Sequence, residues 1–186
     1  MDDLTSVKAA ARKAAFARRK EAHSEARSTA GVANLLSVMT EHKGKVIAGY
    51  MPMRTEIIPT PVMAAMSAHG PICVPVIEAA GFPLKFALWD PGTKMVEGAF
   101  GASIPEKPEY VEPEVVIAPL VAFDLKGGRL GYGGGFYDRT LEGLRAKRPT
   151  LAIGYAYAAQ RADDLPLEPT DQPLDAIVTD EGIHWF

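Results

Sequence analysis

The sequence has little of three features that would define its class at once: cysteine, long apolar runs and an excess of charge. Cys73 is the only cysteine, which excludes an intrachain disulfide, and the apolar residues Ile72 and Val74 beside it predict a buried thiol. No apolar run approaches the length of a transmembrane helix or shows the pattern of a signal peptide. The formal net charge of −3 gives no reason to expect a nucleic acid or an anionic membrane as a partner.

Basic residues are nevertheless concentrated at the start of the chain. Residues 1–27 contain seven Lys or Arg and four Asp or Glu, and this acidic content argues against a transit peptide. Arg18, Arg19 and Lys20 form a charge run that we expect on the solvated surface. The four histidines lack the spacing of a zinc site. The 186 residues, 47% of them hydrophobic, are typical of one globular domain, and we expect a cytoplasmic monomer folded over residues 1–186.

Apolar patterns along the chain predict helices that alternate with strands. The expected helices cover residues 5–23, 28–42 and 61–69, with another after residue 135. The expected strands cover residues 46–50, 71–76, 84–89, 115–120, 151–155 and 176–178. Because the strands are continuous apolar runs, we predict an α/β fold: a Rossmann-like three-layer α/β/α sandwich with a mostly parallel central sheet. Residues 90–114, which are rich in Pro, Gly and Glu, are expected to form a surface loop.

The most informative stretch follows the apolar run at 115–123. Six glycines occur within residues 127–135, called here the glycine segment, and a helix-like stretch comes next. A strand, a glycine-rich loop and a helix start together favour phosphate binding, because backbone N–H groups can approach an anion and the helix dipole attracts it. Lys126 and Arg129 add positive charge, and Asp138, in the first helical turn, is either a dipole-stabilised carboxylate or a magnesium ligand.

The glycine segment fits neither common phosphate motif. The dinucleotide fingerprint requires glycine at its first, third and sixth positions, and Phe136 occupies the sixth after Gly131 and Gly133. The Walker pattern requires Lys and then Ser or Thr after its last glycine, whereas Gly134 and Gly135 follow Gly133. A tight turn remains the alternative. Ordering six glycines is costly in backbone entropy and a turn needs one or two, which favours a ligand-binding loop.

Two runs of residues, 119–124 (PLVAFD) and 128–138 (GRLGYGGGFYD), resemble the signature of the 5-formyltetrahydrofolate cyclo-ligase family, also called methenyltetrahydrofolate synthetases. Lys8 and Arg12 near the start, Glu56 after the first strand, and Asp171 and Asp175 near the end agree in order along the chain. The resemblance implies that 5-formyltetrahydrofolate is converted to 5,10-methenyltetrahydrofolate, with ATP consumed, ADP and phosphate released, and Mg²⁺ required. The γ-phosphoryl group is transferred to the formyl oxygen, and N10 attacks the resulting iminium phosphate.

The resemblance also implies roles for particular residues. For ATP these are Lys8, Arg12, Arg129, Leu130, Gly131, Tyr132, Gly133, Gly134, Gly135, Phe136 and Tyr137. For the folate substrate they are Met51, Glu56, Tyr132, Gly133, Gly134, Gly135 and Phe136. The implied catalytic residues are Arg129, Tyr132 and Tyr137, and the implied Mg²⁺ ligands are Asp138 and Asp171, with Asp175 as the less favoured alternative.

Some of these roles also have a physical rationale in the residues themselves. Lys8 and Arg12 are four residues apart and therefore share a helix face. A carboxylate such as Glu56 can accept the paired donors of an aminopyrimidine ring. Some relatives carry basic residues where this chain has Tyr132 and Gly134, so a stacking or hydroxyl role is expected for Tyr132.

Three alternatives to this activity remain open. A paralogue could apply the same ATP-dependent chemistry to another formamide or pterin-like substrate, and Glu56 is the feature that favours folate. A non-catalytic folate-binding protein would have no need of Lys8, Arg12 and Asp138, which are all present. A relative of sugar-phosphate isomerases or CoA-transferases would not need Asp138 and Asp171 together. For the activity that the resemblance implies, the expected partners are the small molecules ATP and 5-formyltetrahydrofolate.

Overall fold

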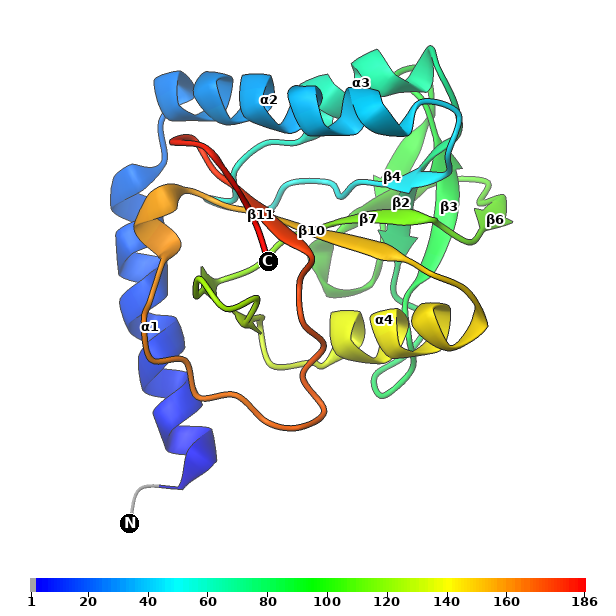
Figure 1. The fold of residues 1–186 in the computed structure, drawn as a ribbon. Coiled ribbons are helices and arrows are strands. Elements are labelled where there is room, and N and C mark those ends of the chain that lie inside the picture. Colours follow the sequence, from blue (N-terminus) through cyan, green and yellow to red (C-terminus); the bar gives the residue numbers. More distant parts are fainter. Residues whose placement is uncertain (1–2) are drawn as a thin grey trace.

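The computed structural model describes residues 3–186, which form an eight-stranded sheet flanked by helices (Figure 1). The α-helices are α1 (Leu4–Ala22), α2 (Glu25–Met39), α3 (Thr60–Ser67) and α4 (Phe136–Lys147). Short 3₁₀ turns are η1 (Thr40–His42), η2 (Ala99–Gly101) and η3 (Ala158–Gln160). The strands are β1 (Ile47–Ala48), β2 (Ile72–Val76), β3 (Lys85–Trp89), β4 (Met95–Glu97), β5 (Ser103–Pro105), β6 (Tyr110–Val111), β7 (Val115–Ala118), β8 (Ala122–Phe123), β9 (Arg129–Leu130), β10 (Leu151–Tyr155), β11 (Ala176–Val178) and β12 (Ile183–Trp185).

The main sheet has the strand order β12-β11-β10-β7-β1-β2-β3-β6. Its five central strands, from β11 to β2, run parallel, which confirms the predicted mostly parallel sheet. The outer strands β12, β3 and β6 are antiparallel to their neighbours. β3 was expected among the strands of this sheet, but its short connection from β2 makes it an antiparallel neighbour, since a parallel one needs a longer crossover.

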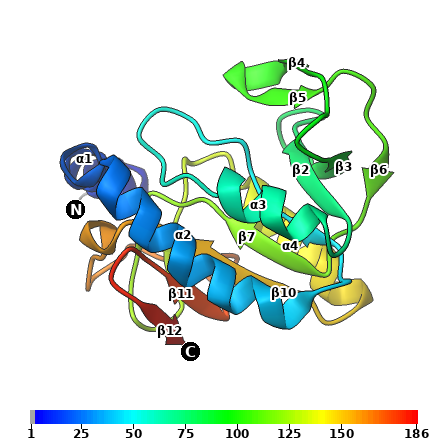
Figure 2. The same cartoon turned by 90° about the horizontal axis from the view of Figure 1, so that it is seen from above.

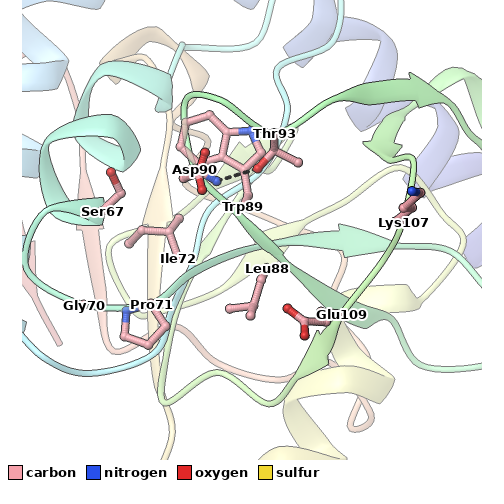
Figure 3. Close-up of a pocket in the computed structure, with 10 residues that line it drawn as sticks. All are labelled: Ser67, Gly70, Pro71, Ile72, Leu88, Trp89, Asp90, Thr93, Lys107 and Glu109. Carbon is pink, nitrogen blue, oxygen red and sulfur yellow. Dashed lines mark hydrogen bonds between the residues drawn. The ribbon is translucent and has the colours of Figure 1, made fainter.

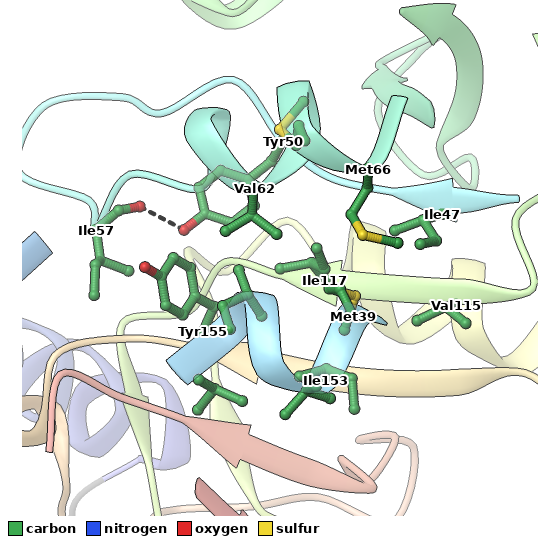
Figure 4. Packing of buried hydrophobic residues seen from close by; sticks show 14 of the residues in the cluster. Met39, Ile47, Tyr50, Ile57, Val62, Met66, Val115, Ile117, Ile153 and Tyr155 are labelled. Carbon is green, nitrogen blue, oxygen red and sulfur yellow. Dashed lines mark hydrogen bonds between the residues drawn. The ribbon is translucent and has the colours of Figure 1, made fainter. Parts of the chain in front are cut away.

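Helices cover both faces of this sheet, as the predicted three-layer sandwich requires. Helices α2 and α3 lie on one face and α4 lies on the other (Figure 1). Alternate residues of β7 divide between the two cores, because side chains of a strand point to opposite faces. Val115 and Ile117 pack with Met39 of α2 and Met66 of α3 (Figure 4). Val116 packs on the other face, toward α4.

Cys73 is fully buried in the core beside α4, as its apolar neighbours predict. Burial raises the pKa of its thiol to about 12. The thiol therefore stays neutral at ordinary pH and packs as a small apolar group.

Helix α1 lies across one end of the sheet rather than on a face (Figure 1). Its inner side packs through Ala15 against a small cluster that contains Val121, Ala122 and Leu130. These three residues belong to the segment around the β8–β9 hairpin, which the sequence analysis did not predict. No helix within residues 3–186 is long and apolar enough to cross a membrane.

The expected surface loop at 90–114 was wrong in part, because this segment contains three strands. Strands β4 and β5 form a hairpin beside β2 and β3 (Figure 2), and β6 pairs with β3 at the edge of the main sheet. The proline and glycine content obscured three strands of only two or three residues. Each is too short to show a clear alternation of apolar and polar residues.

The order of the strands reverses between β1 and β7. From β1 the chain proceeds outward through β2 and β3, whereas from β7 it proceeds in the other direction through β10 and β11. In open α/β sheets, ligands bind beyond the carboxyl ends of the strands at such a switch point. The segments that leave β1 and β7 are therefore the ones expected to form a binding site.

Candidate functional site

A cleft of about 790 Å³ lies at this switch point. Residues 50–56, which follow β1, form part of its wall, and residues 129–139, from β9 into α4, form another. Helix α1 and the turn at 168–171 contribute further polar groups. The residues assigned to ATP, to folate and to the favoured metal pair all line this one cleft: Lys8, Arg12, Met51, Glu56, Arg129, Leu130, Gly131, Tyr132, Gly133, Gly134, Gly135, Phe136, Tyr137, Asp138 and Asp171. Asp175, the less favoured metal ligand, does not line it and forms an ion pair with Arg145 at 3.1 Å.

The last five residues of the glycine segment connect the β8–β9 hairpin to α4. Gly133 and Gly135 have φ angles of +103° and +68°, a conformation that residues with a Cβ rarely adopt. This backbone brings the chain from the hairpin into the first turn of α4, where Asp138 lies as predicted. The positive end of the α4 dipole therefore faces the same region as the glycine backbone.

Two cations from α1 line the cleft, Arg12 beside the glycine segment and Lys8 beside the turn at 168–171. Arg12 donates through Nε to the carbonyl oxygen of Gly131 at 2.7 Å, and its guanidinium lies beside Gly133. Lys8 forms an ion pair with Glu168, and its Nζ lies 3.6 Å from Oδ2 of Asp171. The predicted helix face with two cations is therefore directed at the cleft, and both side chains are partly buried.

Asp138 and Asp171 are brought together by the turn that contains Gln172. The backbone N–H of Gln172 donates to Oδ1 of Asp138 at 2.8 Å, and Asp171 is the residue immediately before Gln172. The guanidinium of Arg129 also donates to Oδ1 of Asp138, at 2.7 Å. Arg129 was expected on a loop around phosphates, but it lies in β9 and is 6% exposed.

The carboxylates of Asp138 and Asp171 fit only a partial set of metal ligands. Within residues 3–186, no three His, Cys, Asp or Glu side chains are grouped so that they could hold a metal ion. Mg²⁺ is usually bound through one or two carboxylates, while phosphates and water complete its octahedron. Because Oδ1 of Asp138 already accepts two hydrogen bonds, Oδ2 is its better-placed ligand atom. The pair is therefore compatible with Mg²⁺ that arrives with a nucleotide.

Glu56 is buried in the cleft wall and makes two hydrogen bonds. Its Oε1 accepts from the hydroxyl of Tyr132 at 2.5 Å, and its Oε2 accepts from the backbone N–H of Met53 at 2.9 Å. Burial raises the pKa of Glu56, while the two hydrogen bonds and the charge of Arg19 oppose this rise. Burial and the charge of Glu56 raise the pKa of Tyr132, so its hydroxyl remains a proton donor.

The predicted surface position of Arg19 was wrong. It was expected on the solvated surface with Arg18 and Lys20, but it is 1% exposed. Its Nη1 donates to the hydroxyl of Tyr132 at 2.6 Å, and its Nε donates to Oγ1 of Thr55 at 3.0 Å. The missed signal was its spacing, because it lies two turns beyond Arg12 on the same stripe of α1.

The sequence analysis also missed other side chains that line the cleft. They are Tyr50, Met53, Arg54, Ser103, Arg139, Glu142, Glu168 and Thr170. Phe100, an aromatic residue that the sequence offers as a possible contact for the rings of the folate, also lines the cleft. Phe100 is 67% exposed and its ring contacts that of Phe136, with centroids 6.2 Å apart. The hydroxyl of Tyr137 is buried and has no hydrogen-bond partner among residues 3–186. An unpaired buried hydroxyl is costly, which makes it a candidate contact for a ligand.

A second depression, of about 460 Å³, lies beside β2 and β3 (Figure 3). Trp89, Asp90 and Lys107 are among the residues around it, and the backbone N–H of Asp90 donates to Thr93. None of the predicted site residues lines it. The chemistry predicted from the sequence is therefore confined to the larger cleft.

The fold and the cleft together define a class: an α/β protein that presents a glycine-rich helix start, two cations and two carboxylates at its switch point. Residues 5–180 match the model of the 5-formyltetrahydrofolate cyclo-ligase family. The chain therefore belongs to the 5-formyltetrahydrofolate cyclo-ligase family and is an enzyme of that family. This confirms the resemblance seen in the sequence.

Relatives in this family are similar over most of the chain. The 5-formyltetrahydrofolate cyclo-ligase of Haemophilus influenzae is 34% identical over 146 residues, which are 75% of this chain and 78% of the relative. The corresponding protein of Mycolicibacterium smegmatis is 32% identical over 146 residues, 73% of this chain and 74% of the relative.

Two solved structures share the fold. The NMR structure of Aquifex aeolicus 5,10-methenyltetrahydrofolate synthetase has a TM-score of 0.77 and 29% identity, covering 96% of this chain and 92% of that one. The 5,10-methenyltetrahydrofolate synthetase of Mycoplasma pneumoniae has a TM-score of 0.70 and 25% identity, covering 93% of this chain and 98% of that one.

Proposed function

We propose that this protein closes the ring of 5-formyltetrahydrofolate to give 5,10-methenyltetrahydrofolate, with ATP converted to ADP and phosphate and with Mg²⁺ bound to the nucleotide. One observation carries the proposal: the residues predicted for ATP and folate and the favoured metal pair, Asp138 and Asp171, line the same cleft at the switch point of the sheet. Family membership supports the substrate, since the relatives are named for this reaction.

The proposed reaction begins by activating the formyl group. A formamide is a poor electrophile and its oxygen is a poor leaving group. The formyl oxygen attacks the γ-phosphorus, the bond to ADP breaks, and an iminium phosphate results. The lone pair of N10 then attacks the formyl carbon, phosphate leaves with the former formyl oxygen, and N10 loses its proton. Both steps depend mainly on positioning and on neutralising phosphate charge.

The chain supplies the cationic and backbone groups for this chemistry. Lys8 and Arg12 line the cleft from α1, and the start of α4 lies at the end of the glycine segment, so a triphosphate bound in the cleft would meet two cations and the positive end of a helix dipole. Arg129 neutralises and orients Asp138. Asp138 and Asp171 would hold Mg²⁺, which when bound offsets phosphate charge. The hydroxyl of Tyr137, which lacks a partner, is available to donate to the phosphoryl group or the formyl oxygen.

Glu56 and its neighbours supply the folate subsite in this proposal. The carboxylate lies in the wall after β1, on the other side of the switch point from α4, and Met51 lines the same region. Phe100 and Phe136 present aromatic surfaces that could pack on the rings of the substrate. The formyl end would then lie between the glycine segment and the pterin, within reach of the terminal phosphate.

A spectroscopic assay tests the proposed reaction directly. Protein, MgATP and 5-formyltetrahydrofolate are mixed, and the near-ultraviolet absorbance of the methenyl product is followed. Product is expected only with the complete mixture; reactions without ATP, or with ADP alone, serve as controls. Release of ADP in proportion to product is the second measurement. ATP-independent product, or no product with active reagents, would overturn the proposal. The predicted monomer, single domain and cytoplasmic location remain predictions.

A further inference from the structure

The buried guanidinium of Arg19 has no carboxylate within ion-pair distance among residues 3–186. A buried charge is costly unless polar groups compensate it. Arg19 instead donates to Thr55 and Tyr132 and stacks its guanidinium near the rings of Phe16 and Tyr132, at 5.1 and 5.7 Å from their centroids. Arg19 is therefore connected to Glu56 by two hydrogen bonds that share the hydroxyl of Tyr132.

This arrangement fixes the direction of the Tyr132 hydroxyl. A guanidinium has donors and no acceptor, so the oxygen of Tyr132 must accept from Arg19. The hydroxyl proton is consequently left for Glu56, whose Oε1 lies 2.5 Å away. A carboxylate that must accept at Oε1, and that also accepts the N–H of Met53 at Oε2, is held in one orientation by both oxygens.

The same two bonds decide what Glu56 can still bind. An ionised carboxylate has about four lone-pair sites, and Tyr132 and Met53 occupy one on each oxygen. One site on each oxygen is left. This pattern matches two parallel N–H donors on a planar ring, as an aminopyrimidine presents them.

We propose that Arg19 is a positioning residue for the folate subsite, acting through the hydroxyl of Tyr132 to hold Glu56 as a two-site acceptor for the pterin ring. This inference rests on the proposed function. It assigns Arg19 no contact with substrate; Glu56 makes the contact, and Tyr132 transmits the orientation. Because Tyr132 also belongs to the glycine segment, the relay joins the folate side of the cleft to the phosphate side.

A double-mutant cycle tests the relay. The variants are Arg19→Met, Tyr132→Phe and their combination. The matched control is Arg18→Met, because Arg18 donates to the carbonyl oxygen of Ala159 at the surface and does not line the cleft. Isothermal titration measures the dissociation constants of 5-formyltetrahydrofolate and of ATP separately. Each single change is expected to weaken folate binding by about tenfold or more, and Arg19→Met is expected to weaken ATP binding by less than about threefold.

The double variant gives the decisive result. If Arg19 acts through Tyr132, the combined loss in folate affinity will be close to that of the worse single change, rather than the product of the two. Arg19→Lys retains a cation and is expected to recover part of the affinity lost in Arg19→Met. Circular dichroism and melting temperatures identify variants that fail to fold. If Arg19→Met does not fold, Arg19→Lys replaces it in the comparison with Tyr132→Phe.

Other outcomes would overturn the inference. They are folate affinity unchanged in Arg19→Met, losses that multiply in the double variant, or ATP affinity reduced as strongly as folate affinity. If the wild-type protein binds and converts 5-formyltetrahydrofolate while the variants behave like Arg18→Met, only the role of Arg19 is refuted. If the wild-type protein does not bind the folate at all, the proposed function itself fails, and this inference with it.

Discussion

Replacing Glu56 by glutamine tests the folate subsite independently of the phosphate subsite. The change keeps the shape of the side chain but removes its charge and converts one acceptor oxygen into an NH₂ donor. In the protein, both oxygens of Glu56 face donors, the hydroxyl of Tyr132 and the N–H of Met53. Glutamine must therefore place its NH₂ against a donor in either orientation of the amide.

The expected loss follows from the bonds that change. A hydrogen bond to a charged group contributes about 1.5–3 kcal/mol, and the two proposed donors of the pterin both lose the charge, while one also loses its acceptor. A net loss of about 3 kcal/mol corresponds to roughly a hundredfold weaker folate binding. The free energy of unfolding should change by less than the free energy of folate binding. Burial raises the pKa of Glu56, so the ionised carboxylate destabilises the fold once the pH exceeds that raised pKa. The glutamine variant removes this cost.

Titration calorimetry with 5-formyltetrahydrofolate and, separately, with MgATP measures the effect. The matched control is Glu114→Gln, since Glu114 also accepts a backbone N–H, from Val46 at 2.9 Å, but lies outside the cleft. We expect a hundredfold-scale loss for folate, little change for ATP, and no change in the control. A folate affinity within about threefold of wild type, or an equal loss for ATP, would refute the assignment of Glu56 to the pterin.

Three other substitutions test the phosphate side and the core. Asp138→Asn retains an acceptor for Arg129 but should weaken apparent Mg²⁺ affinity about tenfold or more in turnover assays, with little change in melting temperature. Gly133→Ala forces a Cβ into a φ of +103° and to 3.4 Å from Arg12, so KM for ATP should rise, whereas Gly143→Ala, in open space, should leave KM unchanged. The pKa of Cys73 is raised from 9.0 to about 12, so the stability that its neutral thiol contributes is lost as the pH rises above 9. The free energy of unfolding of the wild type, measured with denaturant, should therefore fall by about 1.4 kcal/mol between pH 7 and 10 relative to that of Cys73→Ala. Equal pH profiles for the two proteins would contradict that result.

The layers of the fold were predictable because buried parallel strands are continuous apolar runs. Residues 115–118 and 151–155 show this pattern, and the structure places both in the centre of the sheet. The β8–β9 hairpin was not predictable, because its strands contain two residues each and show no period. The apolar residues at 121–123 therefore looked like an extension of the preceding strand.

The composition of the site was predictable, whereas its internal pairing was not. The glycine segment and the resemblance identified residues that the structure brings into one cleft. Nothing in the sequence showed that Arg129 would be buried against Asp138. Arg19 was misassigned because a run of three charges looks solvated when it is considered without the helix phase. The partner of a charge depends on tertiary packing, and one sequence does not reveal it.

The position of α1 explains why one helix can serve both sides of the cleft. Lys8, Arg12, Ala15 and Arg19 follow the spacing of one helical stripe, so all four face the protein. Ala15 is fully buried against the β8–β9 hairpin, and its small side chain lets α1 lie close to the segment that leads into the glycines. Turns on the N-terminal side of this contact place Arg12 beside the glycine segment and Lys8 beside the turn at 168–171, and the turn on the C-terminal side places Arg19 beside Tyr132. Because α1 carries residues of both the phosphate and the folate subsites, a shift of α1 should affect the two subsites together.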